Sequence, residues 1–365
     1  MSAAPIPADI HTLADYERHA AARIAPATWA HIAQGNTPAN RAAFASRGLL
    51  PRPLADLTQG STATTLFGQR HAAPILLAPV AYHRLVHEAG EIASAQGAAA
   101  LDTTMVVSTL SSVPLEDIAR ATRDAARELG HAAPPPGWFQ LYTQPDPAQS
   151  LALVRRAEEA GFAVLVVTVD AAVKRADFAL PPGVGAANLA GFAPQQHRTG
   201  TLNGQVVFGS PLAQTAPTWE TLAWLRRETA LPMVVKGLLH PADVIRAREC
   251  GADGVIVSNH AGRVLDGVVP ALAMLPAIRA ALGPDFPLLF DSGVRSGADA
   301  LKAMALGAQA VLVGAPQLHA LAVGGMAGVA HMLHILRTEF ELAMAQCGCT
   351  QTSAIGPDLV VPTGF

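Results

Sequence analysis

The sequence is poor in charge, in aromatic residues and in cysteine. Only 15% of its 365 residues are charged, and 25 basic against 28 acidic side chains leave a formal net charge of −3. Half of the residues are hydrophobic, which excludes a disordered chain and predicts a large buried core in one or two domains. Because no basic block occurs, the composition also argues against nucleic acid as the main partner.

Long apolar runs and a secretion signal are missing as well. We expect no membrane span, because we find no uncharged apolar run of the roughly 18–20 residues that a spanning helix requires. The first residues lack a basic segment followed by an apolar one, so no secretory signal is expected. Cys250, Cys347 and Cys349 are an odd number of cysteines without a second cluster for a zinc site. We therefore expect thiols in a reducing cytoplasm and no bound metal.

Short apolar runs alternate with helix-like segments after residue 53. Eight runs rich in Val, Leu and Ile show no polar alternation, which is typical of strands buried on both faces. These runs are Ile75–Ala78, Met105–Ser108, Trp138–Tyr142, Val164–Val169, Met233–Lys236, Gly254–Ser258, Leu288–Asp291 and Ala310–Gly314. Eight strands with interleaved helices predict an α/β fold, a (β/α)8 TIM barrel. A dinucleotide fold is disfavoured because no Gly-x-Gly-x-x-Gly follows the first strand.

Three further segments flank or interrupt this barrel, which we place in residues 75–320 of a single domain spanning 1–365. Residues 1–50 predict a helical N-terminal extension, with helical patterns at Leu13–Ile32 and Asn40–Ala45. Residues 171–225 carry many prolines, glycines and polar residues, and a connection of this length predicts a lid loop after the fourth strand. Residues 321–348 predict a C-terminal helix.

Polar residues stand at the carboxyl ends of the predicted strands. In a barrel these ends meet at one rim, where reacting groups lie. The residues are Ser108, Gln140, Tyr142, Thr168, Asp170, Lys236, Ser258, Asn259, His260, Asp291 and Gly314. Each alone is explained equally well as an ordinary strand end, but the whole set predicts a site at this rim.

The loops after the seventh and eighth strands predict a phosphate site. Asp291–Gly297 reads Asp-Ser-Gly-Val-Arg-Ser-Gly, and its glycines let backbone N–H groups approach an anion. Arg295 supplies paired donors, and Gly314 ends the neighbouring strand. The alternative is a flexible loop with a surface arginine.

His260 and Arg263 predict proton transfer on a substrate that carries a carboxylate. Histidine titrates near neutrality and accepts protons, and a guanidinium three residues later can hold a carboxylate through two donors. Asp170 is expected to orient the imidazole. Lys236 ends an apolar strand and needs an anion beside it, which a reduced flavin would provide. The alternative is a structural histidine.

Five of these segments together resemble one known family. They are Ser258–Gly267, Asp291–Gly297, Trp138–Tyr142, Thr168–Asp170 and Val234–Gly237. They resemble the FMN-dependent 2-hydroxy acid oxidases and dehydrogenases, which include glycolate oxidase, lactate oxidase and mandelate dehydrogenase. The likeness runs from about Leu13 to Gly348, and Ala78–His83 is most similar to the mandelate and 4-hydroxymandelate oxidase branch. It implies FMN as cofactor and a homotetramer.

The resemblance implies a role for each matching residue. His260 is then the base, or the proton acceptor that accompanies hydride transfer, with Asp170 as its partner. The other residues implied in catalysis or substrate binding are Tyr142, Lys236, Arg263, Arg175 and His31. Those implied at the isoalloxazine or ribityl chain are Pro79, Val80, Ala81, Ser108, Gln140, Thr168, Lys236 and Ser258. Those implied at the phosphate end are Asp291, Ser292, Gly293, Val294, Arg295, Gly314 and Ala315.

The implied reaction is oxidation of an L-2-hydroxy acid to the 2-keto acid. An aryl substrate such as mandelate is slightly favoured over lactate or glycolate, and electrons pass to oxygen or an external acceptor. Two alternatives stay open. A flavin-dependent isomerase would need a second basic cluster, which we do not see. A catalytically impaired relative that acts as a binding protein is kept open by three departures from the pattern that the resemblance implies. His31 stands in place of tyrosine, Ala261 in place of glycine and Ala315 in place of arginine.

Ala315 leads to a prediction about FMN retention. The resemblance places an arginine after Gly314, and this chain has alanine there. Losing an arginine–phosphate contact costs about 1.5–3 kcal/mol, or roughly one to two decades in affinity. We therefore predict that FMN is lost on extensive dialysis, as measured by the flavin absorbance that remains per protein chain. Stoichiometric retention would contradict this prediction.

Overall fold

A closed parallel sheet forms the centre of the molecule. The computed structural model describes residues 5–35, 37–131, 133, 135–171, 178–192, 207–208, 213 and 216–363. Its eight-stranded sheet has the order β4-β11-β10-β9-β8-β7-β6-β5, and a parallel bridge between Leu77 and Met105 joins the first strand to the last. The strands are β4 (Ile75–Leu77), β5 (Val106–Ser108), β6 (Trp138–Leu141), β7 (Val164–Thr168), β8 (Met233–Leu238), β9 (Gly254–Val257), β10 (Leu288–Phe290) and β11 (Ala310–Val313). The predicted (β/α)8 barrel is confirmed.

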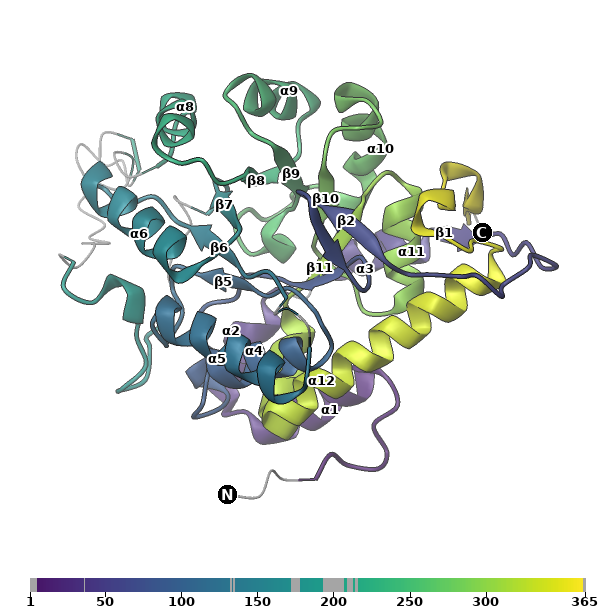
Figure 1. Ribbon diagram of the computed structural model, residues 1–365, viewed down its shortest axis with the longest axis horizontal. Coiled ribbons are helices and arrows are strands. Elements are labelled where there is room, and N and C mark those ends of the chain that lie inside the picture. Colours follow the sequence, from purple (N-terminus) through teal and green to yellow (C-terminus); the bar gives the residue numbers. More distant parts are fainter. Residues whose placement is uncertain are drawn as a thin grey trace.

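A helix follows each strand and covers the outside of the barrel (Figure 1). These helices are α4 (Glu91–Ala100), α5 (Leu115–Glu128), α6 (Pro147–Ala160), α8 (Trp219–Glu228), α9 (Pro241–Glu249), α10 (Ala271–Leu282), α11 (Gly297–Ala305) and α12 (Ala315–Gln346). Local sequence sets where they begin. In α6, for example, Pro147 stands at the first turn, where its missing N–H costs nothing, and the Asp146 side chain accepts a hydrogen bond from Ala148 N.

The strands bury both faces in two separate cores, as their uninterrupted apolar runs predict. One face packs against the helices, and the other fills the barrel with side chains such as Leu76, Val166 and Ile256. A hairpin of β2 (Thr64–Leu66) and β3 (Gln69–His71) closes the amino end of the barrel, where the Phe67 ring meets Trp138 at a centroid distance of 5.5 Å. Chemistry is therefore confined to the carboxyl end.

The N-terminal extension differs from the prediction in detail. The single helical stretch expected at Leu13–Ile32 is two helices, because Pro26 has no N–H to continue the first one. The elements are α1 (Leu13–Arg23), α2 (Pro26–Ala33), α3 (Pro38–Ala45) and the strand β1 (Arg47–Leu49). β1 pairs antiparallel with β12 (Val360–Pro362), so the end of the N-terminal extension and the C-terminal strand form a small sheet.

Helix α12 corrects two expectations. It begins at Ala315, six residues before the predicted start at residue 321, and it bends where Gly324 and Gly325 leave the helical conformation. By length and composition it could cross a membrane, so the expectation that no apolar run is long enough was wrong. However, 61% of its most apolar window is buried, and the helix packs against α1, α4 and α11 (Figure 1). This is the environment of a core helix.

The predicted lid region is described only in part. Helix α8 begins at Trp219, within the span of residues 171–225 that was assigned to the lid. In the described part, the short 3-10 turn η2 (Ala187–Leu189) lies against the loop that connects β5 to α5. The buried Asn188 side chain accepts a hydrogen bond from Leu115 N at 2.9 Å and donates one to Ser111 Oγ at 2.8 Å. This stretch is therefore anchored to the barrel.

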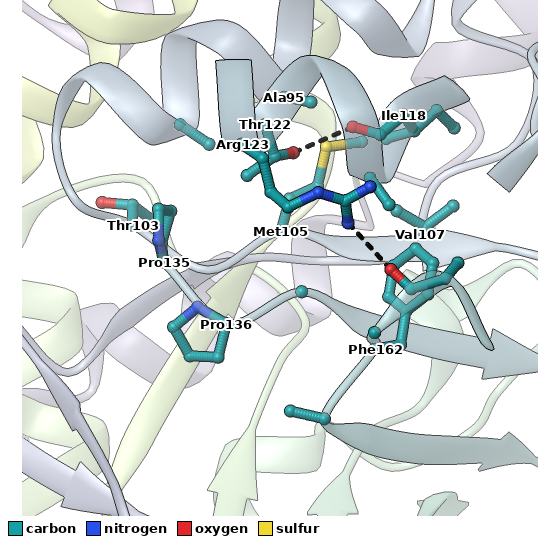
Figure 2. A pocket seen from close by; sticks show the side chains of 16 residues that line it. Ala95, Thr103, Met105, Val107, Ile118, Thr122, Arg123, Pro135, Pro136 and Phe162 are labelled. Atoms are coloured by element: carbon teal, nitrogen blue, oxygen red, sulfur yellow. Dashed lines mark hydrogen bonds between the residues drawn. The ribbon is translucent and has the colours of Figure 1, made fainter. Parts of the chain in front are cut away.

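A cavity of about 230 Å³ lies at the amino ends of β5, β6 and β7, under helices α4 and α5. Figure 2 shows its lining, which is mostly apolar and includes Met105, Val107, Ile118 and Phe162. Arg123 crosses it and donates a hydrogen bond to Ala160 O at 2.9 Å. Because the cavity lies at the opposite end of these strands from the polar rim, it is not the reactive site.

Close contact between α11 and α12 leads to a stability prediction. A Cβ atom on Gly297 would lie 2.0 Å from the backbone nitrogen of Phe340, so the two helices can approach only because residue 297 is glycine. We expect Gly297→Ala to lower the free energy of unfolding by about 2–3 kcal/mol or more. Gly185→Ala is the matched control, because its Cβ would meet no atom within 4 Å. Equal unfolding midpoints in urea for both variants would contradict the prediction.

Candidate active site

His260 and Asp170 meet at the carboxyl end of the barrel, although 90 residues separate them. Asp170 follows β7 and His260 follows β9, and His260 Nδ1 lies 3.0 Å from Asp170 Oδ1. Strand β8 runs between them and has an irregular register at Lys236–Leu238. At this bulge Gly237 has φ +109°, and a Cβ on it would stand 2.5 Å from Asp170 Cγ. The glycine therefore makes room for the carboxylate.

The Asp170 carboxylate fixes the state of the imidazole. Burial acts to raise its pKa, but the hydrogen bond from His260 and the charges of His260 and Lys236 outweigh burial, and the pKa is lowered. Asp170 is thus ionised near neutral pH and accepts the proton on Nδ1. The neutral imidazole then carries its lone pair on Nε2, which is the form needed in a general base.

Lys236 is a buried cation with its counter-ion in place. Its Nζ lies 2.9 Å from Asp291 Oδ2 and donates to Ser258 Oγ at 2.9 Å, and the residue is only 4% exposed. Burial acts to lower its pKa, but the carboxylates of Asp291 and Asp170 raise it overall. The anion that Lys236 was expected to need is therefore Asp291. Asp291, which the resemblance placed at the phosphate end, faces the lysine.

Ser258 and Ser292 connect these groups to the backbone. Ser258 Oγ accepts a hydrogen bond from His260 N at 3.1 Å in addition to that from Lys236. Ser292 Oγ donates to Asp291 Oδ1 at 2.8 Å and accepts from Ala261 N at 3.1 Å. Both were predicted as cofactor contacts; in the structure they also hold the histidine and the ion pair in one network.

Arg263 and Tyr142 complete the polar group at this rim. The Arg263 guanidinium donates to His31 O at 2.9 Å and to Ile32 O at 2.6 Å. Because a guanidinium has five N–H donors, three are left for a carboxylate. Burial raises the pKa of Tyr142, with a further contribution from the charge of Asp170, so its phenol stays protonated and can donate. Arg175 lies outside the described residues.

The N-terminal extension contributes more to the site than His31, the residue that the resemblance implied there. Besides the His31 and Ile32 carbonyls, Asn40 on α3 exchanges two hydrogen bonds with Asn259, at 3.0 and 2.9 Å. The His31 ring stacks on Phe178 at a centroid distance of 4.3 Å. In the sequence, the signal for Asn40 was a polar residue in the helical stretch predicted at Asn40–Ala45. This signal does not indicate its partner, which lies 219 residues away.

The rim also offers unsatisfied polar atoms that fit a flavin. Gln140 Nε2 and Thr168 Oγ1 are buried, and neither has a hydrogen-bond partner in the described part of the chain. Ser108 Oγ donates to Gln140 Oε1 at 3.0 Å, which orients the amide. Buried polar groups are normally paired, so a ligand with both donors and acceptors is expected here. The isoalloxazine edge has that pattern, and these residues fit FMN.

Two loops predicted to hold phosphate lie at the neighbouring strand ends. Ser296 caps α11, where Gly297 N donates to Glu339 Oε2 at 2.8 Å, and Gly314 stands at the N-cap of α12, so the positive dipole ends of both helices lie at these two loops. Arg295 N donates to Asp299 Oδ2 at 3.0 Å, and burial lowers the pKa of the Arg295 guanidinium. Val80 lies next to Gly314, 3.7 Å from the position that a Cβ would take, which brings Pro79–Ala81 to the same edge.

Ala261 stands where the resemblance implies glycine, and this affects the backbone conformation beside His260. Ala261 and His260 both have positive φ, +57° and +52°. Residues other than glycine adopt this conformation at a cost of about 1–2 kcal/mol. The chain therefore keeps the left-handed turn that places His260, although it lacks the glycine expected from the resemblance.

Known proteins are similar to this chain in both sequence and fold. Residues 20–362 match the FMN-dependent dehydrogenase family. An L-lactate oxidase of Alicycliphilus denitrificans is 45% identical over 98% of each chain, and a 4-hydroxymandelate oxidase of Amycolatopsis orientalis is 44% identical over 87% of each. Mandelate oxidase, solved with benzoyl-formic acid, superposes with a TM-score of 0.83 at 40% identity, over 95% of this chain and 97% of the other. The chain is a member of the FMN-dependent dehydrogenase family.

Proposed function

We propose that this protein oxidises an L-2-hydroxy acid to the corresponding 2-keto acid. The observation that carries the proposal is the His260–Asp170 pair, with its 3.0 Å contact, next to a half-buried arginine and a protonated tyrosine. The reaction removes two electrons and two protons from the substrate, and FMN accepts the electrons when bound. Family membership favours this reaction over a non-redox isomerase or an inactive binding protein.

The residues of the chain supply binding, orientation and proton transfer. The free N–H donors of Arg263, together with the predicted Arg175, bind the substrate carboxylate. The Tyr142 hydroxyl donates a hydrogen bond beside them. His260 Nε2 accepts the proton of the substrate hydroxyl, and the Asp170 carboxylate stabilises the imidazolium that forms. Holding all of these groups on strand ends reduces the entropy lost on reaching the reactive geometry.

An aryl side chain on the substrate is favoured by the aromatic residues at this rim. The His31 ring, on the extension whose carbonyl oxygens hold Arg263, stacks on Phe178 of the loop after β7. The Tyr82 and Tyr142 hydroxyls influence each other electrostatically, which places Tyr82 close to the site as well. Mandelate, with a phenyl ring, would bury more apolar surface against such a wall than lactate. Lactate is the second candidate, because the relative at 45% identity is an L-lactate oxidase.

Oxygen is the proposed electron acceptor, because the relatives with the highest identity quoted above are oxidases. A homotetramer and a cytoplasmic location stay predictions. The second is supported by Cys250, Cys347 and Cys349, which are free thiols, as expected in a reducing compartment.

Substrate choice is tested by anaerobic absorbance of the FMN-reconstituted protein. We expect (S)-mandelate to bleach the flavin band faster than L-lactate at equal concentration, because the aromatic wall adds contacts only to the phenyl ring. Readmitted oxygen should restore the band and yield one hydrogen peroxide per keto acid. Faster bleaching by lactate would reverse the substrate assignment, and restoration only by an added carrier would exclude oxygen as acceptor. Failure of both substrates with flavin bound would refute the proposed function.

Asp170→Asn tests the histidine pair. An amide donates where the carboxylate accepts, so the imidazole would take the wrong tautomer and lose stabilisation of its charged form. We expect kcat to fall by about 10²–10⁴-fold, with FMN affinity within about twofold of the wild type. Asp266→Asn, the same chemical change at an exposed position of the His260 loop, should leave kcat unchanged. Retention of more than half of the wild-type kcat in Asp170→Asn would rule out this role.

A further inference from the structure

Helix α12 places a histidine one turn beyond the position where the arginine is missing. Gly314 stands at its N-cap and Ala315 is its first residue. His319 follows four residues later, so both side chains lie on one face of the helix, with Cβ atoms about 5–6 Å apart. An alanine side chain cannot bind an anion. A histidine side chain can, through a ring N–H, and more strongly when it is protonated.

His319 is buried beside helix α2. It is 3% exposed, and its ring packs on Trp29 of α2 with centroids 5.3 Å apart. No hydrogen bond joins its ring to another residue in the described ranges. Neither ring nitrogen is among the fully buried polar atoms without a partner, so both are open to a ligand that supplies the missing hydrogen bond.

Arg295 connects His319 to the anion site. Burial, followed by the positive charge of Arg295, lowers the pKa of His319 to about 3. The guanidinium predicted to bind phosphate is therefore close enough to act on this ring. Arg295 itself is influenced by Glu17 of α1, Arg41 of α3 and Asp299 of α11. Arg41 is committed elsewhere, since it pairs with Asp299 at 2.6 Å and donates to Gly293 O at 2.7 Å.

We propose that His319 is a ligand of the FMN phosphate and takes over the contact that an arginine at position 315 would make. In the protein without FMN the ring is neutral, because burial and Arg295 both oppose its charge. A phosphate dianion placed between His319 and Arg295 stabilises a charged ring. Binding of FMN then takes up a proton, and His319 offsets part of the affinity lost with the arginine at position 315.

The expected pH dependence follows from this proton uptake. If the pKa of His319 is higher with FMN bound than without it, affinity increases as the pH falls. We expect FMN to bind more tightly at pH 6.5 than at pH 8. Below about pH 6 the phosphate itself becomes protonated, which acts in the opposite direction. The phosphate titrates in the same way in every variant. In a variant without the histidine, the pH dependence of FMN affinity therefore reflects the phosphate alone.

The experiment compares FMN with riboflavin, which lacks the phosphate. Dissociation constants are measured by flavin fluorescence with the cofactor-free full chain and three variants. His319→Phe keeps a ring against Trp29 and removes the N–H. We expect it to weaken FMN binding by about 10-fold or more, to leave riboflavin binding within twofold, and to abolish the tightening at low pH. Ala315→Arg in the His319→Phe background should restore FMN affinity without affecting riboflavin.

His319→Gln separates hydrogen bonding from charge. Its amide N–H can still donate to phosphate, so part of the FMN affinity should remain, whereas the pH dependence should disappear. It also replaces His319→Phe as the test if that variant does not fold, as judged by circular dichroism. The ³¹P chemical shift of bound FMN should differ between the wild type and either variant.

Two results would overturn the proposal. Equal weakening of FMN and riboflavin would show that His319 only packs against Trp29. Unchanged FMN affinity in the variants would show that the phosphate does not touch the histidine. Both readouts concern cofactor binding and need no substrate, so they are independent of whether the protein oxidises mandelate, lactate or neither.

Discussion

The buried charge of Lys236 is the constraint around which the rim is arranged. A cation that is 4% exposed is tolerated only with anions close by, and the chain supplies Asp291 in direct contact and Asp170 nearby. Asp170 in turn holds His260 through Nδ1. The electrostatic requirement of one lysine therefore places the carboxylate that makes the histidine a base. Ser258, which contacts both Lys236 and His260, connects the ion pair to the base.

Much of the fold could be predicted from the sequence because each strand is buried on both faces. Such strands are continuous apolar runs whose ends are local features, and all eight were placed within two residues of their bounds. The rim followed, because polar residues interrupt those runs where the strands end. The length of the apolar run in α12 was underestimated. A core helix that is buried around most of its surface has the apolar composition of a membrane span, so composition alone does not distinguish the two.

The parts of the site that escaped prediction depend on contacts between distant segments. The Asn40–Asn259 pair joins the extension to β9, and Gly237 matters only because a bulge turns it towards Asp170. Neither residue has a local pattern that shows its partner. Arg263 illustrates the same limit. Its motif indicates a carboxylate ligand, but the guanidinium is positioned by backbone carbonyls of His31 and Ile32, and backbone groups leave no mark in a sequence.

This dependence on backbone groups explains why residue 31 can vary. Its carbonyl oxygen orients Arg263 whatever the side chain is, and the side chain itself stacks on Phe178. The predicted phosphate site differs from the Arg263 site in this respect. There the contact depends on the side chain itself, and the methyl group of Ala315 cannot bind an anion. His319, which we propose as the phosphate ligand, lies one turn further along α12 on the same face.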